Sequence, residues 1–169
     1  LAPANDTAID AALQWTQQTG NAIVTLADEA YPRALLDSPD PAILLYVKGA
    51  LAPLQTPALA IVGARTATPQ GEANARAFAE ALAAAGFSIV SGMALGIDAA
   101  AHSGALAHPH GHTTAVIGTG ADRIYPAANQ QLAYQIAERG TLISEFPLGT
   151  PPLAHHFPRR NRIIAGLVR

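Results

Sequence analysis

Short apolar runs alternate with longer alanine-rich or amphipathic stretches along the chain, and from residue 59 onward this alternation is regular. Four runs have the length of buried strands: 59–63, 87–92, 113–118 and 141–145. The stretches between and after them predict helices at 71–85, 97–107 and 129–139 and from residue 163 onward. Strands alternating with helices in this way are typical of a parallel sheet with helices on both faces. We therefore predict a Rossmann-like α/β fold for residues 58–169.

Residues 1–57 follow a different pattern. The periodicity predicts a helix over 8–18, an extended segment over 21–26 and a strand over 43–47. Five prolines between positions 32 and 57 disfavour long helices in this region. We expect a short Pro-rich α/β lead-in that packs on the Rossmann-like domain or extends it.

Composition narrows the class of protein. The chain has 169 residues, which suits one domain with a sizeable core, and half of them are hydrophobic, which excludes a disordered protein. Cysteine is absent, so disulfides and thiolate chemistry are excluded. There is neither a signal peptide nor an apolar run of about 20 residues, so we expect no membrane partner. The sequence starts with leucine, and we expect it to be a fragment.

Charge is unevenly distributed behind the formal net charge of −2. Residues 1–57 carry six acidic residues against two basic ones, and residues 58–150 carry six against four. Residues 151–169 contain four arginines and no acidic residue. Nine of the ten basic residues are arginine, whose guanidinium group suits bidentate contacts with phosphate. The distribution of charge therefore indicates an anionic partner, although the net charge alone does not.

Small residues and arginines collect where the predicted strands end. Ligands of open parallel sheets bind beyond the carboxyl ends of the strands, and glycine or serine there lets backbone N–H groups approach a phosphate. The phosphate-binding residues predicted in these turns are Gly63, Arg65, Ser91, Gly92, Gly118 and Gly120. Just before and at the start of the last predicted helix lie Arg159, Arg160, Asn161 and Arg162. Because a helix N-terminus disfavours added cations, arginines placed there indicate a bound anion.

The usual cofactor-binding and catalytic motifs are missing. Gly118-Thr-Gly120 starts a dinucleotide fingerprint, but the sixth position is Arg123, and no G-x-x-x-x-G-K-[ST] loop occurs. Ser91 does not lie in a G-x-S-x-G elbow. We therefore predict no cofactor and no catalytic residue.

Three further features each have two interpretations. Asp98 and His102 are spaced i, i+4 on a predicted helix, so their side chains can meet. They form either an acid–base pair or, as we favour, a helix cap (Asp98) with a histidine partner. Glu145 ends a strand and either faces the ligand or pairs with an arginine. The tract His108-Pro-His-Gly-His112 is similar to a metal-binding run, but its loop setting favours solvated histidines, and we predict no metal site.

Six blocks of sequence around these positions resemble the DNA-processing protein A family (DprA, also called Smf). They run in order through the chain: Ile61-Val-Gly-Ala-Arg65, Ser91-Gly-Met-Ala-Leu-Gly-Ile-Asp-Ala-Ala-Ala-His102, Ala115-Val-Ile-Gly-Thr-Gly-Ala-Asp122, Ile124-Tyr-Pro126, Ser144-Glu-Phe-Pro147 and Phe157-Pro-Arg-Arg-Asn-Arg-Ile-Ile-Ala-Gly-Leu167. The Rossmann-like domain of that family continues with further strands and often follows a small helical domain. The resemblance therefore implies an incomplete domain here.

The resemblance also implies a function. Members of the family are bacterial cytoplasmic proteins of natural transformation, often dimeric, that bind and protect incoming single-stranded DNA, help to load a RecA-type recombinase and are not known for catalysis. By motif position, Arg65 and residues 159–162 line a positive pocket for DNA phosphate, and the turns at Gly63, Ser91–Gly92 and Gly118–Gly120 form its floor. The alternative is a nucleotide-binding or nucleotide-processing enzyme on a similar fold, which the absence of a Pro-Gly-Gly loop disfavours.

Overall fold

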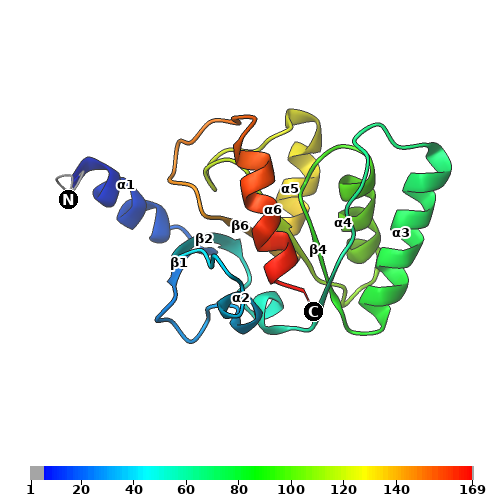
Figure 1. The fold of residues 1–169 in the computed structure, drawn as a ribbon, viewed down its shortest axis with the longest axis horizontal. Coiled ribbons are helices and arrows are strands. Elements are labelled where there is room, and N and C mark those ends of the chain that lie inside the picture. The colour runs from blue at the N-terminus through cyan, green and yellow to red at the C-terminus, as the bar shows by residue number, and fades with distance from the viewer. Residues whose placement is uncertain (1–5, 169) are drawn as a thin grey trace.

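The computed structural model describes residues 6–168, which form one six-stranded sheet with helices on both faces (Figure 1). The strands are β1 (Asn21–Thr25), β2 (Leu44–Gly49), β3 (Ala58–Ala60), β4 (Ser88–Ser91), β5 (Thr113–Val116) and β6 (Thr141–Ser144). The helices are α1 (Asp6–Thr16), α2 (Arg33–Leu36), α3 (Pro69–Ala84), α4 (Ile97–Ala107), α5 (Gln130–Arg139) and α6 (His156–Gly166), with 3₁₀ turns at η1 (Ala52–Gln55) and η2 (Ala127–Asn129). The predicted α/β class is confirmed.

The strands lie in the order β1-β2-β6-β5-β4-β3, and β3 to β6 are parallel. Because these four strands neighbour one another in chain order, right-handed crossovers place α3, α4 and α5 on the same face of the sheet. The strand residues that pack beneath these helices are Ile89, Ala115 and Leu142. The residues that follow them along each strand face the core under α2 and α6, namely Val90, Val116 and Ile143. Figure 1 shows α6 crossing this second face.

The lead-in belongs to the same sheet. β1 pairs with β2, and β2 pairs with β6, both antiparallel, with Tyr46 opposite Ser144 and Gly49 opposite Thr141. The predicted parallel sheet is therefore correct for β3–β6, and the lead-in extends it with two antiparallel strands. Whether the boundary at residues 57 and 58 separates two folding units stays a prediction.

Alanine and glycine on α3 and α4 let these two helices pack closely. Fully buried Ala79 and Ala101 belong to the core between the two helices and β4. A Cβ atom at Gly104 would collide with the carbonyl of Arg76 on α3. Small side chains therefore set the spacing of the layer that holds the β4–α4 turn in place.

Helix α6 differs from its prediction. It begins at His156, seven residues before the predicted start at residue 163. The predicted start leaves Pro158 outside the helix, but proline is tolerated in the first turn of a helix, where its missing N–H is not needed. The residues 159–162 therefore lie on the helix itself, and successive side chains point in different directions around its axis.

Candidate nucleic-acid interface

An open groove of about 750 Å³ lies beyond the carboxyl ends of β3 and β4 and along one side of α6. Its polar end contains Gly63, Arg65, Asp98, Phe157, Arg160 and Asn161. The rest of the wall includes Ala60 of β3 and Ile164 and Ala165 of α6. The groove is thus at the edge of the sheet where the sequence analysis placed the phosphate ligand.

Arg65 is the exposed cation of this groove. It lies in the turn after β3, and its guanidinium carbon is 5.3 Å from the centroid of the Phe157 ring. Among residues 6–168, no carboxylate forms an ion pair with it. Stacking on an aromatic face holds a guanidinium group in position while its N–H edge stays available. Arg65 can therefore donate to an anion.

Arg160, by contrast, is buried, with only 4% of its surface exposed. Its Nη1 donates to the backbone carbonyls of Gly92 and Val116, and its Nε donates to Oδ1 of Asn161 at 2.9 Å. Burial lowers the pKa of Arg160; the nearby Asp98 carboxylate opposes this shift, and the charge of Arg65 adds to it. Arg160 therefore ties α6 to the ends of β4 and β5 and places a positive charge at the groove wall.

The Asp98 carboxylate lies between the turn that follows β3 and the turn that follows β4. Oδ1 accepts a hydrogen bond from the N–H of Gly63 at 3.4 Å, and Oδ2 accepts from the N–H groups of Gly92 and Ala94 at 3.2 and 3.3 Å. The backbone donors that were predicted to face a phosphate at Gly63 and Gly92 are thus directed at a carboxylate of the chain itself. Because Asp98 lies in the first turn of α4, it ties three separate segments together around one anion.

His102 forms a hydrogen bond with Thr113 rather than Asp98, and the N-cap of α4 is Gly96, so neither of the two sequence interpretations of this pair is correct. Its Nδ1 lies 2.7 Å from Oγ1 of Thr113, which itself donates to the carbonyl of Ile89 at 2.6 Å. Since the Thr113 proton is used, Nδ1 is the donor in this pair. Burial, and secondly the charge of Arg160, lower the pKa of His102 to about 3.

The remaining small residues of the predicted site lie beneath other segments. Ser91 is fully buried and donates to the carbonyl of Ile61 at 2.6 Å. Gly118 packs against Phe157, and its carbonyl lies 3.1 Å from Nδ1 of His156. The N–H of Gly120 donates to the carbonyl of Thr150 at 3.0 Å. The polar groups of these three residues thus form hydrogen bonds within the protein. Their contribution to phosphate binding stays a prediction.

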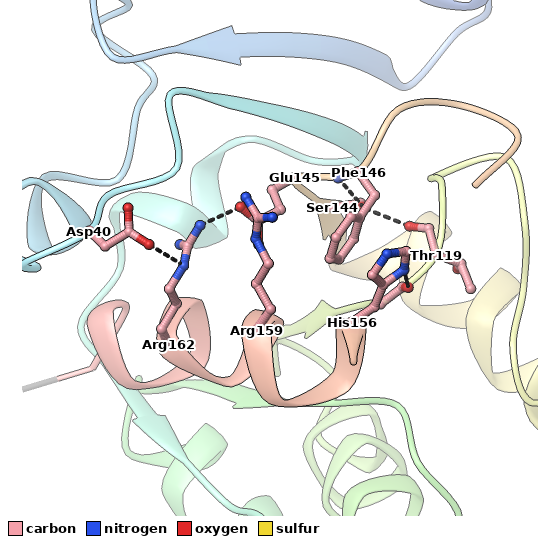
Figure 2. A network of polar contacts seen from close by, with 9 residues as sticks. Asp40, Thr119, Ser144, Glu145, Phe146, His156, Arg159 and Arg162 are labelled. Carbon is pink, nitrogen blue, oxygen red and sulfur yellow. Dashed lines mark hydrogen bonds and ion pairs between the residues drawn. The ribbon is translucent and has the colours of Figure 1, made fainter. Parts of the chain in front are cut away.

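The other arginines of α6, Arg159 and Arg162, extend toward Glu145 (Figure 2). Glu145, at the end of β6, receives Arg162 Nη2 on one carboxylate oxygen and lies 3.4 Å from Arg159 Nε through the other. Arg162 Nε also lies 2.9 Å from Oδ2 of Asp40 in the lead-in. Of the two sequence interpretations of Glu145, the structure shows the ion pair. The cluster 159–162 is therefore divided between two sides of the helix.

Replacing Glu145 with glutamine is expected to lower the free energy of unfolding by about 1–3 kcal/mol, because it leaves Arg162 without its buried partner. Only 6% of the Glu145 side chain is exposed, against 74% for Asp40. Asp40→Asn removes an exposed partner of the same arginine and should cost less than about 1 kcal/mol. Urea unfolding of the two variants measures the difference, and equal losses would contradict the assigned role of Glu145.

Two groups that build this interface, Asp98 and Phe157, were not among the site residues predicted from the sequence. Asp98 was considered only together with His102, although its position just after Gly92-Met-Ala-Leu-Gly is the signal that it could reach the turns. Phe157 was not among the predicted site residues, but its ring supports Arg65 and lies 5.7 Å from the ring of Tyr125. Both roles depend on contacts between segments far apart in the sequence.

No group of three acidic or histidine side chains in residues 6–168 lies in an arrangement suited to a metal ion. The rings of His108 and His110 lie edge to face at 6.1 Å. No helix of the described part of the chain has the length and apolar character that crossing a membrane requires.

Comparisons with known proteins place the chain in one family. The family model of DNA recombination-mediator protein A matches residues 22–169. Protein Smf of Synechocystis is 47% identical over 93% of this chain, and Protein Smf of Escherichia coli is 44% identical over 94% of it. The chain spans only 40% and 42%, respectively, of the length of these two relatives.

Two solved structures are similar over most of the chain. DNA processing protein A from Streptococcus pneumoniae has a TM-score of 0.84 and 42% identity, covering 94% of this chain and 55% of that protein. A DNA processing protein A from Helicobacter pylori, whose structure addresses its single-stranded DNA binding mode, has a TM-score of 0.77 and 34% identity, covering 86% and 66%. Together with the match of the family model, these similarities show that the chain belongs to the DNA recombination-mediator protein A family.

Proposed function

We propose that this chain binds single-stranded DNA without catalysis, and that the phosphate backbone enters the groove at Arg65. The observation that carries the proposal is the exposed Arg65 guanidinium, which stacks on Phe157, has no carboxylate partner in the described residues and lies in the same groove as Arg160. Family membership and the single-stranded DNA binding of the Helicobacter pylori relative support it.

In this proposal the predicted site residues have different functions. Arg65 contacts phosphate directly, whereas Arg160 contributes positive potential and, with Asp98, holds Gly63 and Gly92 in the shape of the groove. Asn161 lies on the groove wall beside Arg160. Arg159 is 61% exposed on the other side of α6 and is proposed as a peripheral contact. Arg162 is proposed to act mainly through the Glu145 ion pair.

The wider functions rest on the family resemblance. We propose that the whole protein protects incoming DNA in natural transformation, helps to load a RecA-type recombinase, forms a homodimer and acts in the cytoplasm. No observation in the groove favours the alternative of a nucleotide-processing enzyme. The Asp98 carboxylate, whose charge acts on Arg160, accepts hydrogen bonds from three backbone N–H groups.

Arg65→Ala is expected to weaken the binding of a labelled oligo(dT) by about ten-fold, because one charge-assisted phosphate contact is lost. The slope of log Kd against log salt concentration should become shallower by about 0.7, the value for one phosphate contact on a single strand. Fluorescence anisotropy over a salt series measures both quantities. Arg76→Ala is the matched control, since Arg76 is an exposed arginine of α3 outside the groove. Equal affinity of the two variants would overturn the proposed site.

A further inference from the structure

The turn after β4 has a backbone conformation that gathers N–H groups on one side. Met93 has a φ of +64°, and among residues 6–168 it is the one residue besides glycine with a positive φ. Turns that contain a left-handed residue form concavities that bind anions through successive backbone N–H groups. Here the N–H groups of Gly92 and Ala94, on either side of Met93, both donate to Oδ2 of Asp98. The turn therefore has the form of an anion-binding site, and its anion is a side chain of the same chain.

Contacts other than this carboxylate hold the donors in position. Nδ2 of the buried Asn129 donates to the carbonyls of Met93 and Ala94 at 2.9 and 3.2 Å. The turn after β3 packs tightly against the start of α4, because a Cβ atom at Gly96 would collide with the carbonyl of Ala64. We therefore expect both turns to keep their shape when the carboxylate is removed.

The Asp98 carboxylate occupies the kind of position that ligand phosphates take in open α/β sheets. There a phosphate group lies beyond the strand ends, and backbone N–H groups of glycine turns donate to its oxygens. Asp98 accepts from Gly63 in the β3 turn with one oxygen and from the β4 turn with the other, at 3.2 to 3.4 Å. Only 5% of Asp98 is exposed, and the charge of the buried Arg160 acts on it. The chain thus satisfies with its own carboxylate the donors that a bound phosphate would use.

The same carboxylate is a negative charge in the wall of the groove. A phosphate group that entered the turns would have to displace it, because the three N–H donors are occupied and like charges repel. Arg65 has no carboxylate partner among residues 6–168 and stays available. One arginine holds a single phosphate weakly, whereas a strand presents many phosphates whose contacts add. The groove therefore favours a polymer of phosphates over a free phosphate group.

We propose that Asp98 is a specificity-determining residue, whose carboxylate closes the turns after β3 and β4 to the phosphate group of free mononucleotides and leaves Arg65 to the DNA strand. This rests on the proposed function. The N–H groups of Gly63 and Gly92 then shape the groove without contacting DNA phosphate. Removal of the carboxylate should create a phosphate site that the unchanged chain lacks.

The test measures thermal unfolding of Asp98→Ala in potassium phosphate and in potassium chloride of the same pH and ionic strength. Phosphate should raise the Tm of this variant by about 3 °C or more once it exceeds its Kd about ten-fold, because it binds only the folded chain. Formate, which carries the lost carboxylate group, should also stabilise the variant. The unchanged chain should show neither effect. In calorimetric titration, the free mononucleotide dTMP should bind Asp98→Ala at least about ten-fold more tightly than the unchanged chain, as expected for charge-assisted hydrogen bonds to phosphate.

Two controls separate the emptied turns from a general change of charge. Asp122→Ala removes an exposed carboxylate that accepts from a single N–H group, that of Gly149, and should create no phosphate site. The double variant that combines Asp98→Ala with Arg65→Ala should keep the effect of phosphate on the Tm, because the backbone donors remain. Loss of the effect in the double variant would place the phosphate at Arg65 instead of in the turns and overturn the proposal.

Asp98→Ser is the second variant, because its shorter side chain also empties the turns. If either variant is unfolded in chloride by circular dichroism, recovery of the folded state in phosphate or formate is the supporting result. The proposal fails if neither anion stabilises either variant. It also fails if the affinity for dTMP is the same in Asp98→Ala and the unchanged chain. The proposed function fails separately, if Arg65→Ala leaves the affinity for oligo(dT) unchanged.

Discussion

Replacing Arg160 with methionine is expected to lower the free energy of unfolding by about 3–5 kcal/mol and to abolish measurable binding of single-stranded DNA at moderate salt. Methionine fills a similar volume but donates no hydrogen bond, so the carbonyls of Gly92 and Val116 lose their donor inside the protein. The buried Asp98 carboxylate also loses its nearby positive charge. The groove then loses both a cation and the anchor that holds α6 against the ends of β4 and β5.

Urea unfolding followed by circular dichroism measures the loss of stability, and anisotropy measures the loss of binding. Arg159→Met is the matched control, because it makes the same change one residue earlier on the same helix, where 61% of the side chain is exposed. Glu145 keeps Arg162 as its partner in this variant, so losing the exposed Arg159 should cost at most about 1 kcal/mol. Similar losses of stability in the two variants would show that the buried contacts of Arg160 do not hold α6 in place.

The free energy of unfolding should fall steadily as the pH drops from about 6.5 towards 3. Folded His102 binds a proton only at a pKa of about 3, because burial and the Arg160 charge oppose the imidazolium, whereas an unfolded histidine binds it near its ordinary value of 6.5. Between these values the unfolded chain holds one more proton, so stability present above pH 6.5 is lost on acidification. This one group contributes a slope of up to about 1.4 kcal/mol per pH unit.

Urea unfolding at several values of pH between 7 and about 4.5 measures this slope. His102→Asn keeps a donor for Thr113 and removes the titrating ring, so its unfolding free energy should depend less steeply on pH. His110→Asn changes an exposed histidine and should keep the original slope. If His102→Asn shows the same pH dependence as the unchanged chain, His102 does not carry the effect.

Helix α6 is the element whose predicted start differs most in consequence from the structure. The arginines 159–162 were predicted to lie just before and at the start of the last helix, but that helix begins seven residues earlier, at His156. On a helix, residues 159 and 160 point about 100° apart, so neighbouring arginines meet different surroundings. One reaches two buried carbonyls and the other reaches Glu145. Local propensity does not reveal this division, because the partners come from β4, β5 and β6.

The sequence by itself determined the order of strands and helices along the chain and the two covered faces of the sheet. It also determined the edge at which the groove lies. Local hydrophobic patterns give the elements, and ligands bind beyond the carboxyl ends of parallel strands. The tertiary structure decided which charges are available. Among residues 6–168, Arg65 has no carboxylate partner, whereas Arg159 and Arg162 share the carboxylate of Glu145. Asp98 accepts from the N–H groups of Gly63 and Gly92. Charge pairing and burial depend on distances between segments far apart in the chain, and only folding sets those distances.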